Sequence, residues 1–318
     1  MNDSIVLDIR DLKSHFFTAK GEVPAVDGVS IEVPAGKIIG IVGESGCGKS
    51  MTAMSVMGLL RYPGKVVGGS ITLEGRDITH LSPRELAKVR GNEISMIFQE
   101  PMTALNPVFR IGDQVDEVLA LHNEKGHDEA QIKARTIELL EMVGIANSEG
   151  VYKMFPHELS GGMRQRVMIA MALACSPKLI IADEPTTALD VTIQAQILDL
   201  LRNLKDQINS SIMFITHDLG VIAEMADYVV VMYAGRIVEQ GTAEEVMERP
   251  RHPYTAGLIH SLPSRGMVPI PPPDPGRLEH TGCPFYPRCP RAMERCGREA
   301  PGEVALPTGG KVRCFLYE

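Results

Sequence analysis

An eight-residue segment has the spacing G-x-x-x-x-G-K-S and consists of Gly43, Glu44, Ser45, Gly46, Cys47, Gly48, Lys49 and Ser50. Glycines let the backbone curl so that successive N–H groups face one anion. The lysine can reach the β- and γ-phosphates of a nucleotide, and the final hydroxyl can ligate Mg²⁺. The segment follows an apolar run and precedes a helical pattern, which is the context that this motif requires. We therefore predict a site for ATP or GTP.

Two carboxylates, Asp183 and Glu184, follow the apolar run Leu179–Ala182. A carboxylate at a strand end suits the coordination sphere of Mg²⁺, and the next one can act as the general base that polarises water. Two acids after a strand are often only a solvated loop. Together with the phosphate loop, they predict hydrolysis.

A second candidate anion site lies at Ser160, Gly161, Gly162 and Met163, where a helical pattern begins. Serine is a good helix N-cap, and helix N-termini attract anions. A single nucleotide in one molecule needs only one such site. Two molecules arranged head to tail can use both, because each molecule can close the nucleotide site of the other.

Four cysteines, Cys283, Cys289, Cys296 and Cys314, have the spacing C-x₅-C-x₆-C-x₁₇-C. The segment has little apolar material, so a metal would supply the missing stabilisation. Zinc ribbons have closer cysteine pairs, and the looser spacing fits a [4Fe–4S] cluster better, with zinc as the alternative. Neighbouring arginines are expected to favour thiolates, and Cys47 is expected to have a lowered pKa at its helix N-terminus.

These residues need an α/β core to position them. Apolar runs predict strands at Ile5–Ile9, Ile38–Val42, Ile94–Phe98, Leu179–Ala182, Ile212–Ile215 and Tyr228–Met232. Helical patterns cover Ser50–Leu60, Gln131–Val143, Gly162–Ala174 and Val191–Gln207. We predict an α/β domain over residues 1–262 with a helical subdomain at about 101–160, a proline-rich linker at 263–276 and a cysteine-rich metal-binding extension at 277–318.

The chain has 318 residues and a net charge of −8, which disfavours bulk nucleic-acid binding. No apolar run approaches the roughly 20 residues that cross a bilayer. The first residues lack a signal-peptide pattern, and we expect reduced cysteines rather than disulfides.

The segment Leu159–Arg166 resembles the signature motif of ABC-type ATPases, and other motifs of that family stand in order around it. The resemblance implies a P-loop NTPase fold of the ABC type. It also implies that Gln99 is the Q-loop glutamine and a Mg²⁺ ligand, Asp190 belongs to the D-loop, and His217 contacts the γ-phosphate. Phe16, or its neighbour Phe17, would stack on adenine, and Met51 would join the phosphate loop in binding ATP.

The stretches Phe98–Pro107 and Arg251–Thr255 resemble the ATP-binding subunits of dipeptide/oligopeptide importers. This resemblance implies a heterodimer with a second ABC ATP-binding subunit, two membrane-spanning permease subunits and an extracytoplasmic peptide-binding protein, with no nucleic acid. It places the chain peripherally on the cytoplasmic face of the bacterial inner membrane and points to an iron–sulfur cluster at the cysteines. The alternatives are an importer for nickel or glutathione, or a soluble ABC-type ATPase acting on nucleic acid or ribosomes. A further alternative is a regulatory iron–sulfur protein whose nucleotide site is only a switch.

Overall fold

The computed structural model describes residues 4–99, 104–123, 126–187, 189–278 and 280–318. The chain divides into two compact units, each described by itself. The first unit comprises Met1–Val6, Val33–Gly36 and Ile78–Met213, and the second comprises Leu7–Glu32, Lys37–Asp77 and Phe214–Glu318. Strand β8 (Ser211–Ile215) carries the chain from the first unit into the second.

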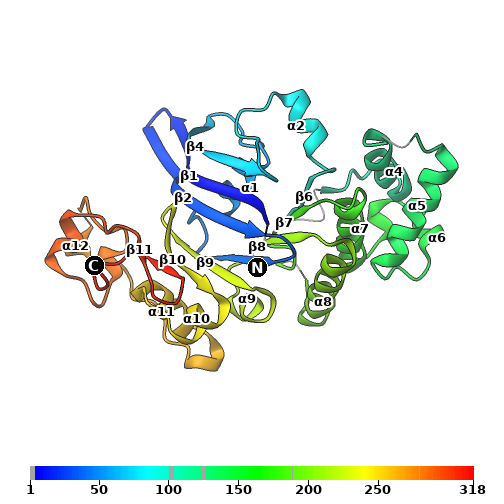
Figure 1. The fold of residues 1–318 in the computed structure, drawn as a ribbon. Helices are drawn as coiled ribbons and strands as arrows, with labels where there is room; N and C mark the ends of the chain where they lie inside the picture. Colours follow the sequence, from blue (N-terminus) through cyan, green and yellow to red (C-terminus); the bar gives the residue numbers. More distant parts are fainter. Residues whose placement is uncertain (1–3, 100–103, 124–125, 188, 279) are drawn as a thin grey trace. The chain divides into compact units, whose positions relative to one another are not determined.

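The first unit pairs two strands with a group of helices (Figure 1). Strand β6 (Ile94–Ile97) lies parallel to β7 (Leu179–Asp183), and every residue of β7 is buried. The helices are α2 (Pro83–Val89), α4 (Ile111–Leu121), α5 (Glu129–Met142), α6 (Ser148–Tyr152), η1 (Pro156–Glu158), α7 (Gly161–Leu173) and α8 (Val191–Ile208).

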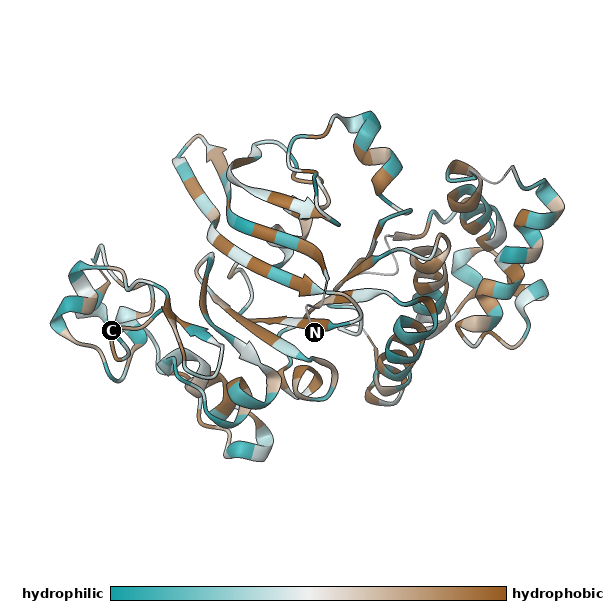
Figure 2. Ribbon diagram, in the orientation of Figure 1, coloured by the Kyte–Doolittle hydropathy of each residue, from teal (hydrophilic) through white to brown (hydrophobic). Residues whose placement is uncertain are grey.

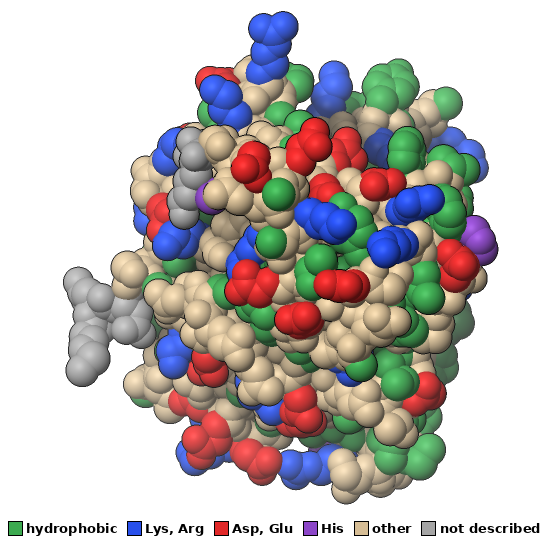
Figure 3. Space-filling model, turned by 90° about the vertical axis from the view of Figure 1, so that its right-hand side faces the viewer, with side chains coloured by type: hydrophobic (Ala, Val, Ile, Leu, Met, Phe, Trp, Pro, Cys, Tyr) green, Lys and Arg blue, Asp and Glu red, His purple; other side chains and the backbone are tan. Residues whose placement is uncertain are grey.

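Helix caps and apolar spacing explain where these helices begin and how they pack. Asp128 caps α5 in a capping box with Gln131, and Ser160 caps α7. Helix α8 buries Ile197, Leu198, Leu201 and Leu204 on one face, the spacing of an amphipathic helix. Figure 3 shows the face that carries α4 to α6, where acidic, basic and hydrophobic side chains are interspersed.

The second unit holds most of a four-stranded sheet in the order β2-β1-β4-β5. Strands β1 (Ile5–Thr18) and β4 (Gly64–Leu73) are antiparallel, flanked by β2 (Gly21–Pro34) and β5 (Arg76–Asp77). Residues of β1 and β2 alternate between hydrophobic and hydrophilic (Figure 2), as expected of strands with one buried face.

The second unit also contains a run of strands in the order β11-β12-β10-β9-β3. Strand β3 (Ile38–Val42) is fully buried and parallel to β9 (Tyr228–Tyr233), which is antiparallel to β10 (Arg236–Thr242). The remaining elements are α1 (Lys49–Val56), α9 (Leu219–Met225), α10 (Ala243–Glu248), α11 (Pro253–His260), η2 (Pro263–Arg265), η3 (Pro275–Arg277), η4 (Tyr286–Arg288), α12 (Glu294–Arg298), β11 (Val304–Ala305) and β12 (Lys311–Val312).

The predicted α/β fold is confirmed, and each of the predicted strands and helices corresponds to an observed element. The ends differ: β1 continues to Thr18, β6 stops before Phe98, and α1 stops at Val56. Strands β2, β4 and β10 were not predicted because they mix apolar and polar residues instead of forming apolar runs. The domain and linker boundaries stay predictions, and part of the predicted helical subdomain, residues 101–103 and 124–125, lies outside the described residues.

The C-terminal segment packs against the rest of the second unit more extensively than its composition predicts. Strand β12 pairs with β10 at Glu239 and Gln240, so the segment extends the edge of a sheet. Phe285 is 1% exposed and packs on aromatic rings of the same unit. Apolar contacts therefore stabilise this segment, in addition to anything that its cysteines bind.

Candidate functional site

The phosphate loop of the second unit connects β3 to α1. Gly48 caps α1 with a φ of 105°, and a Cβ at this position would lie 2.5 Å from the carbonyl oxygen of Ala25. Only glycine fits such a conformation and such a close approach. The Lys49 ammonium is buried and donates to the carbonyl oxygens of Gly43 at 2.7 Å and Glu44 at 3.1 Å. The loop thus brings all eight predicted phosphate-binding residues together, with Met51 in the first turn of α1.

The predicted low pKa of the Cys47 thiol is wrong. Burial raises this pKa, and the attraction to Lys49, whose Nζ lies 3.8 Å from the Cys47 sulfur, offsets only part of the effect. The prediction was based on the helix N-terminus alone. The sequence does not show the packing that desolvates the sulfur.

In the first unit, Asp183 and Glu184 follow one another at the end of β7. Asp183 is 5% exposed, and Glu184 has a φ of 47°, a conformation that costs a non-glycine residue of the order of 1–3 kcal/mol. Glu184 Oε2 accepts hydrogen bonds from Gln99 Nε2 at 3.0 Å and from Thr187 Oγ1 at 2.8 Å. The structure therefore unites Gln99 with Glu184, 85 residues later in the chain.

Thr187 is a further candidate site residue, which the sequence alone did not indicate. It stands three residues after Glu184, a spacing at which a turn brings the two side chains together. A hydroxyl that donates to the carboxylate fixes its orientation, as expected for a group that must direct water.

The signature segment begins α7 in the first unit. Ser160 Oγ accepts from the N–H of Met163 at 3.3 Å, so the residue is an N-cap, and Ser160 and Gly161 are exposed. Asp190 caps α8 through the N–H of Ile193 at 3.0 Å. Ala188 of the predicted D-loop and residues 100–103 of the importer-like stretch lie outside the described residues.

His217 and the two candidate aromatic residues belong to the second unit. His217 is exposed and follows β8, whose end is tied to β3 by a bond from the N–H of Thr216 to the oxygen of Ile41 at 3.2 Å. Phe16 is half-buried, and Phe17 is 45% exposed with Lys65 Nζ 5.9 Å above its ring. Their roles, like those of the other predicted site residues, stay predictions.

The cysteine-rich segment brings its four thiols around one small pocket. Cys283, Cys289, Cys296 and Cys314 line it together with His252 and Phe285, and none is in a disulfide. Burial raises the pKa of Cys283 to about 11 and also raises the pKa of Cys289 and of Cys314. Charge on the neighbouring thiols adds to each shift.

The predicted metal centre is not supported by the side-chain geometry. In the described ranges, no group of three or more His, Cys, Asp or Glu side chains is placed to hold a metal ion. The expected thiolates are also not supported, because burial is the largest influence on Cys283, Cys289 and Cys314 and raises the pKa of each. Three of the neighbouring arginines pair with carboxylates. Arg288 pairs with Glu44, Arg295 with Glu299, and Arg298 with Glu294.

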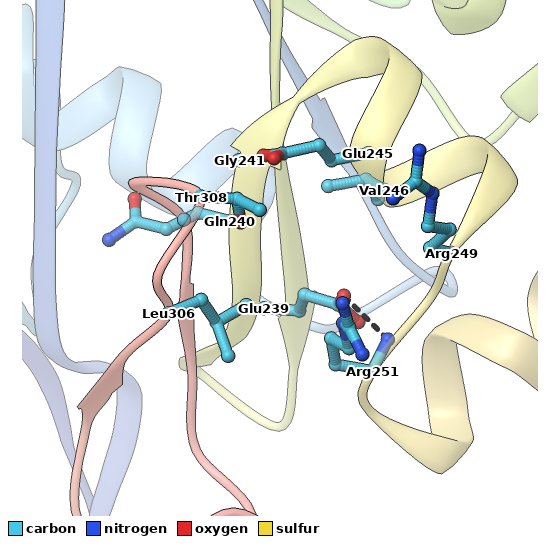
Figure 4. Close-up of a pocket in the computed structure, with 10 residues that line it drawn as sticks. Glu239, Gln240, Gly241, Glu245, Val246, Arg249, Arg251, Leu306 and Thr308 are labelled. Atoms are coloured by element: carbon cyan, nitrogen blue, oxygen red, sulfur yellow. Dashed lines mark hydrogen bonds between the residues drawn. The ribbon is translucent and has the colours of Figure 1, made fainter.

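A second pocket lies where β10, α10 and the C-terminal loop meet (Figure 4). The Glu239 carboxylate in its wall accepts from the N–H groups of Arg251 at 2.7 Å and His252 at 2.8 Å. Burial raises the pKa of Glu239. These bonds hold the start of α11, and with it Tyr254, against the sheet.

Comparison with known proteins identifies the family. The model of the ABC transporter family matches residues 26–187, more than half of the chain, and the model of the oligopeptide/dipeptide transporter C-terminal region matches residues 238–296. The chain belongs to the ABC transporter family. The first match contains the phosphate loop, the signature segment, Asp183 and Glu184, and the second contains all but the last of the four C-terminal cysteines.

Relatives match this ABC protein over nearly its whole length. It is 50% identical to the oligopeptide transport ATP-binding protein AppD of Bacillus subtilis, with 99% of this chain and 98% of that protein aligned. It is 52% identical to the oligopeptide transport ATP-binding protein OppD of Salmonella typhimurium, with 98% and 94% aligned. The OppD protein of Escherichia coli is 51% identical, with 98% and 93% aligned.

Solved structures of ABC proteins share the fold. The dimeric post-hydrolysis state of the ATP-binding cassette MJ0796, bound to ADP and Pi, has a TM-score of 0.67 and 26% identity over 74% of this chain and 98% of that one. CbiO1 of Clostridium perfringens, part of an ABC transporter complex, has a TM-score of 0.66 and 28% identity over 77% and 92%. The predicted ABC-type nucleotide-binding fold is confirmed.

Proposed function

We propose that this chain is the ATP-hydrolysing subunit that energises a bacterial ABC importer for dipeptides or oligopeptides. The observation that carries the proposal is the presence of both a complete phosphate loop in the second unit and the Gln99–Glu184–Thr187 cluster in the first, in a chain about half identical to oligopeptide transport ATP-binding proteins. An intact loop and an oriented carboxylate favour turnover over a passive nucleotide switch.

The proposed mechanism relies on positioning and electrostatics. Lys49 and the N–H groups of the loop hold the β- and γ-phosphates, and His217 contacts the γ-phosphate. Ser50, Asp183 and Gln99 would offer the oxygen ligands that Mg²⁺ prefers. When bound, the ion would neutralise charge that develops on the phosphates. Glu184, held by Gln99 and Thr187, orients the attacking water and accepts its proton.

The active assembly is proposed to be a head-to-tail pair of ATP-binding subunits. Each nucleotide then contacts the phosphate loop of one subunit and the segment Ser160–Met163 of the other, whose exposed helix N-terminus suits an anion. Within the described residues, no helix has the length and apolar character that a membrane crossing needs. Two permease subunits and an extracytoplasmic binding protein would complete the importer, with this chain on the cytoplasmic face of the inner membrane.

A separate proposal is that a metal binds to the four C-terminal cysteines, Cys283, Cys289, Cys296 and Cys314. The proposal is motivated by four cysteines that line one pocket and are free of disulfides, and it requires their side chains to rearrange, because among the described residues no three are placed to hold a metal ion. Four thiolates suit a [4Fe–4S] cluster, and zinc is the alternative. The test is to measure iron, sulfide and zinc in anaerobically purified protein. Replacing all four cysteines by serine should remove the metal and lower the melting temperature. Stoichiometric metal in that variant would contradict it.

The Glu184→Gln variant tests the proposed function. Glutamine keeps one oxygen that can accept from Gln99 or Thr187 but cannot take a proton, so ATP hydrolysis should fall at least ~100-fold while ATP binding persists. The dimer should then accumulate in its closed, ATP-bound form. Glu138→Gln is the matched control, because Glu138 is an exposed residue of α5 that pairs with Arg135. Near-normal turnover by Glu184→Gln would remove Glu184 from the mechanism.

A further inference from the structure

Glu44, the second residue of the phosphate loop, is held at three points. Its N–H donates to the Tyr254 hydroxyl at 2.9 Å, and its carbonyl oxygen accepts from Lys49 Nζ at 3.1 Å. Its carboxylate accepts two bonds from Arg288, one from Nη1 to Oε2 at 2.7 Å and one from Nη2 to Oε1 at 3.1 Å. The last contact links the phosphate loop to a residue 244 positions later.

Arg288 is itself held in place. It ends η4, directly before Cys289, and its side chain is only 16% exposed. Its Nε donates to the carbonyl oxygen of Pro271 at 2.9 Å, so the guanidinium uses one edge for the proline-rich segment and the other for Glu44. The hydrogen bonds that Arg288 donates to Glu44 raise the pKa of Arg288. A planar fork bound to both carboxylate oxygens fixes direction as well as charge.

A buried aromatic cluster supports the same contacts. The Phe285 ring, three residues before Arg288, lies 5.4 Å from the Tyr254 ring and 5.2 Å from the Tyr233 ring. The rings of Tyr233 and Tyr254 are 4.7 Å apart, and Tyr254 is fully buried. Packing on several sides fixes the Tyr254 hydroxyl that accepts from Glu44. Phe285 also lines the pocket of the four thiols.

The charge of Glu44 makes this arrangement relevant to nucleotide binding. An unpaired carboxylate in a loop that binds a polyphosphate would repel the ligand, and a neighbouring guanidinium cancels that effect. We propose that Arg288 is a positioning residue for ATP: it neutralises Glu44 and, with Tyr254, holds the phosphate loop. The affinity for ATP then depends on the C-terminal segment. The inference rests on the proposed function, because its readout is binding and turnover of ATP.

The Arg288→Ala variant of the full chain tests this inference. Its Kd for ATP should rise about 5-fold or more, and its KM should rise similarly, while kcat at saturating ATP stays within about twofold. Arg298→Ala is the matched control, because Arg298 belongs to the same segment and pairs with Glu294 on its own helix. Unchanged ATP affinity in a folded Arg288→Ala variant would overturn the inference.

A double-mutant cycle with Glu44→Gln separates the loss of the Arg288–Glu44 charge pair from a general disturbance of the fold. If Arg288 acts through Glu44, replacing Arg288 should cost much less ATP affinity once residue 44 is neutral. Additive effects of the two substitutions would overturn the inference. Should Arg288→Ala fail to fold, Arg288→Gln provides the same test, since it removes the charge and keeps much of the side chain. Failure of the unaltered chain to bind ATP would instead refute the proposed function.

Discussion

Gly48→Ala is a sharp test of the phosphate-loop geometry. The substitution forces alanine to a φ of 105°, which costs about 1–3 kcal/mol of stability. The new Cβ would lie 2.5 Å from the Ala25 carbonyl oxygen, well inside the 3.4 Å at which ordinary contact begins. Because a backbone oxygen cannot rotate away, the loop must move by roughly 1 Å, and a displacement of that size can cost ~100-fold in rate.

The assay compares ATP affinity, kcat/KM and melting temperature with those of Gly75→Ala. Gly75 has a φ of 82° in the turn between β4 and β5, and a Cβ there meets nothing within 4 Å. We expect Gly75→Ala to lose about 1–2 kcal/mol of stability and no ATP affinity, because it pays only the cost of the left-handed conformation. Gly48→Ala should lose at least ~10-fold in ATP affinity as its loop shifts. Wild-type affinity in Gly48→Ala, or an equal loss in both variants, would refute this geometry.

Three further predictions concern the second unit. Phe285→Ala should lower the free energy of unfolding by ~3–5 kcal/mol, measured by denaturation against exposed Met293→Ala; a loss no larger than in that control would contradict the packing. Burial lowers the pKa of His252 from 6.5 to about 4, so the native state favours neutral His252. This contribution to the free energy of unfolding should be fully present above pH 6.5, and up to ~3 kcal/mol of it should be lost as the pH falls towards 4. In the His252→Asn variant, asparagine can still cap α11 but does not titrate in this range, so the pH dependence should disappear. A pH profile identical to that of the unaltered chain would contradict the prediction. Cys47, whose pKa is raised, should react slowly with iodoacetamide, more slowly still with ATP present, and its complete alkylation should abolish ATPase activity; full activity after alkylation would disprove this.

Local pattern was enough to predict the strands, loop and helix around those candidate site residues that are contiguous in sequence. The apolar run before Gly43 gave β3, the glycines gave the loop, and Lys49 begins the helix as expected. The same held for β7 and its two terminal acids, because a strand buried on both faces is a continuous apolar run.

Features that depend on long-range packing could not be predicted. The contact of Arg288 with Glu44 joins residues 244 positions apart, and nothing in either local sequence indicates it. The raised pKa of Cys47 follows from burial, which no motif encodes. Strands β2 and β4 depend on pairing partners, so their mixed sequences gave no clear signal.

Peptide uptake driven by this chain is the most direct test of the account. In cells whose only copy carries Glu184→Gln, accumulation of a labelled oligopeptide should stop, whereas the Glu138→Gln control should import at the wild-type rate. Labelled dipeptide, glutathione and nickel assayed in parallel identify the solute. Oligopeptide and dipeptide uptake that continues at the wild-type rate with Glu184→Gln would contradict the claim that ATP hydrolysis by this chain powers peptide import.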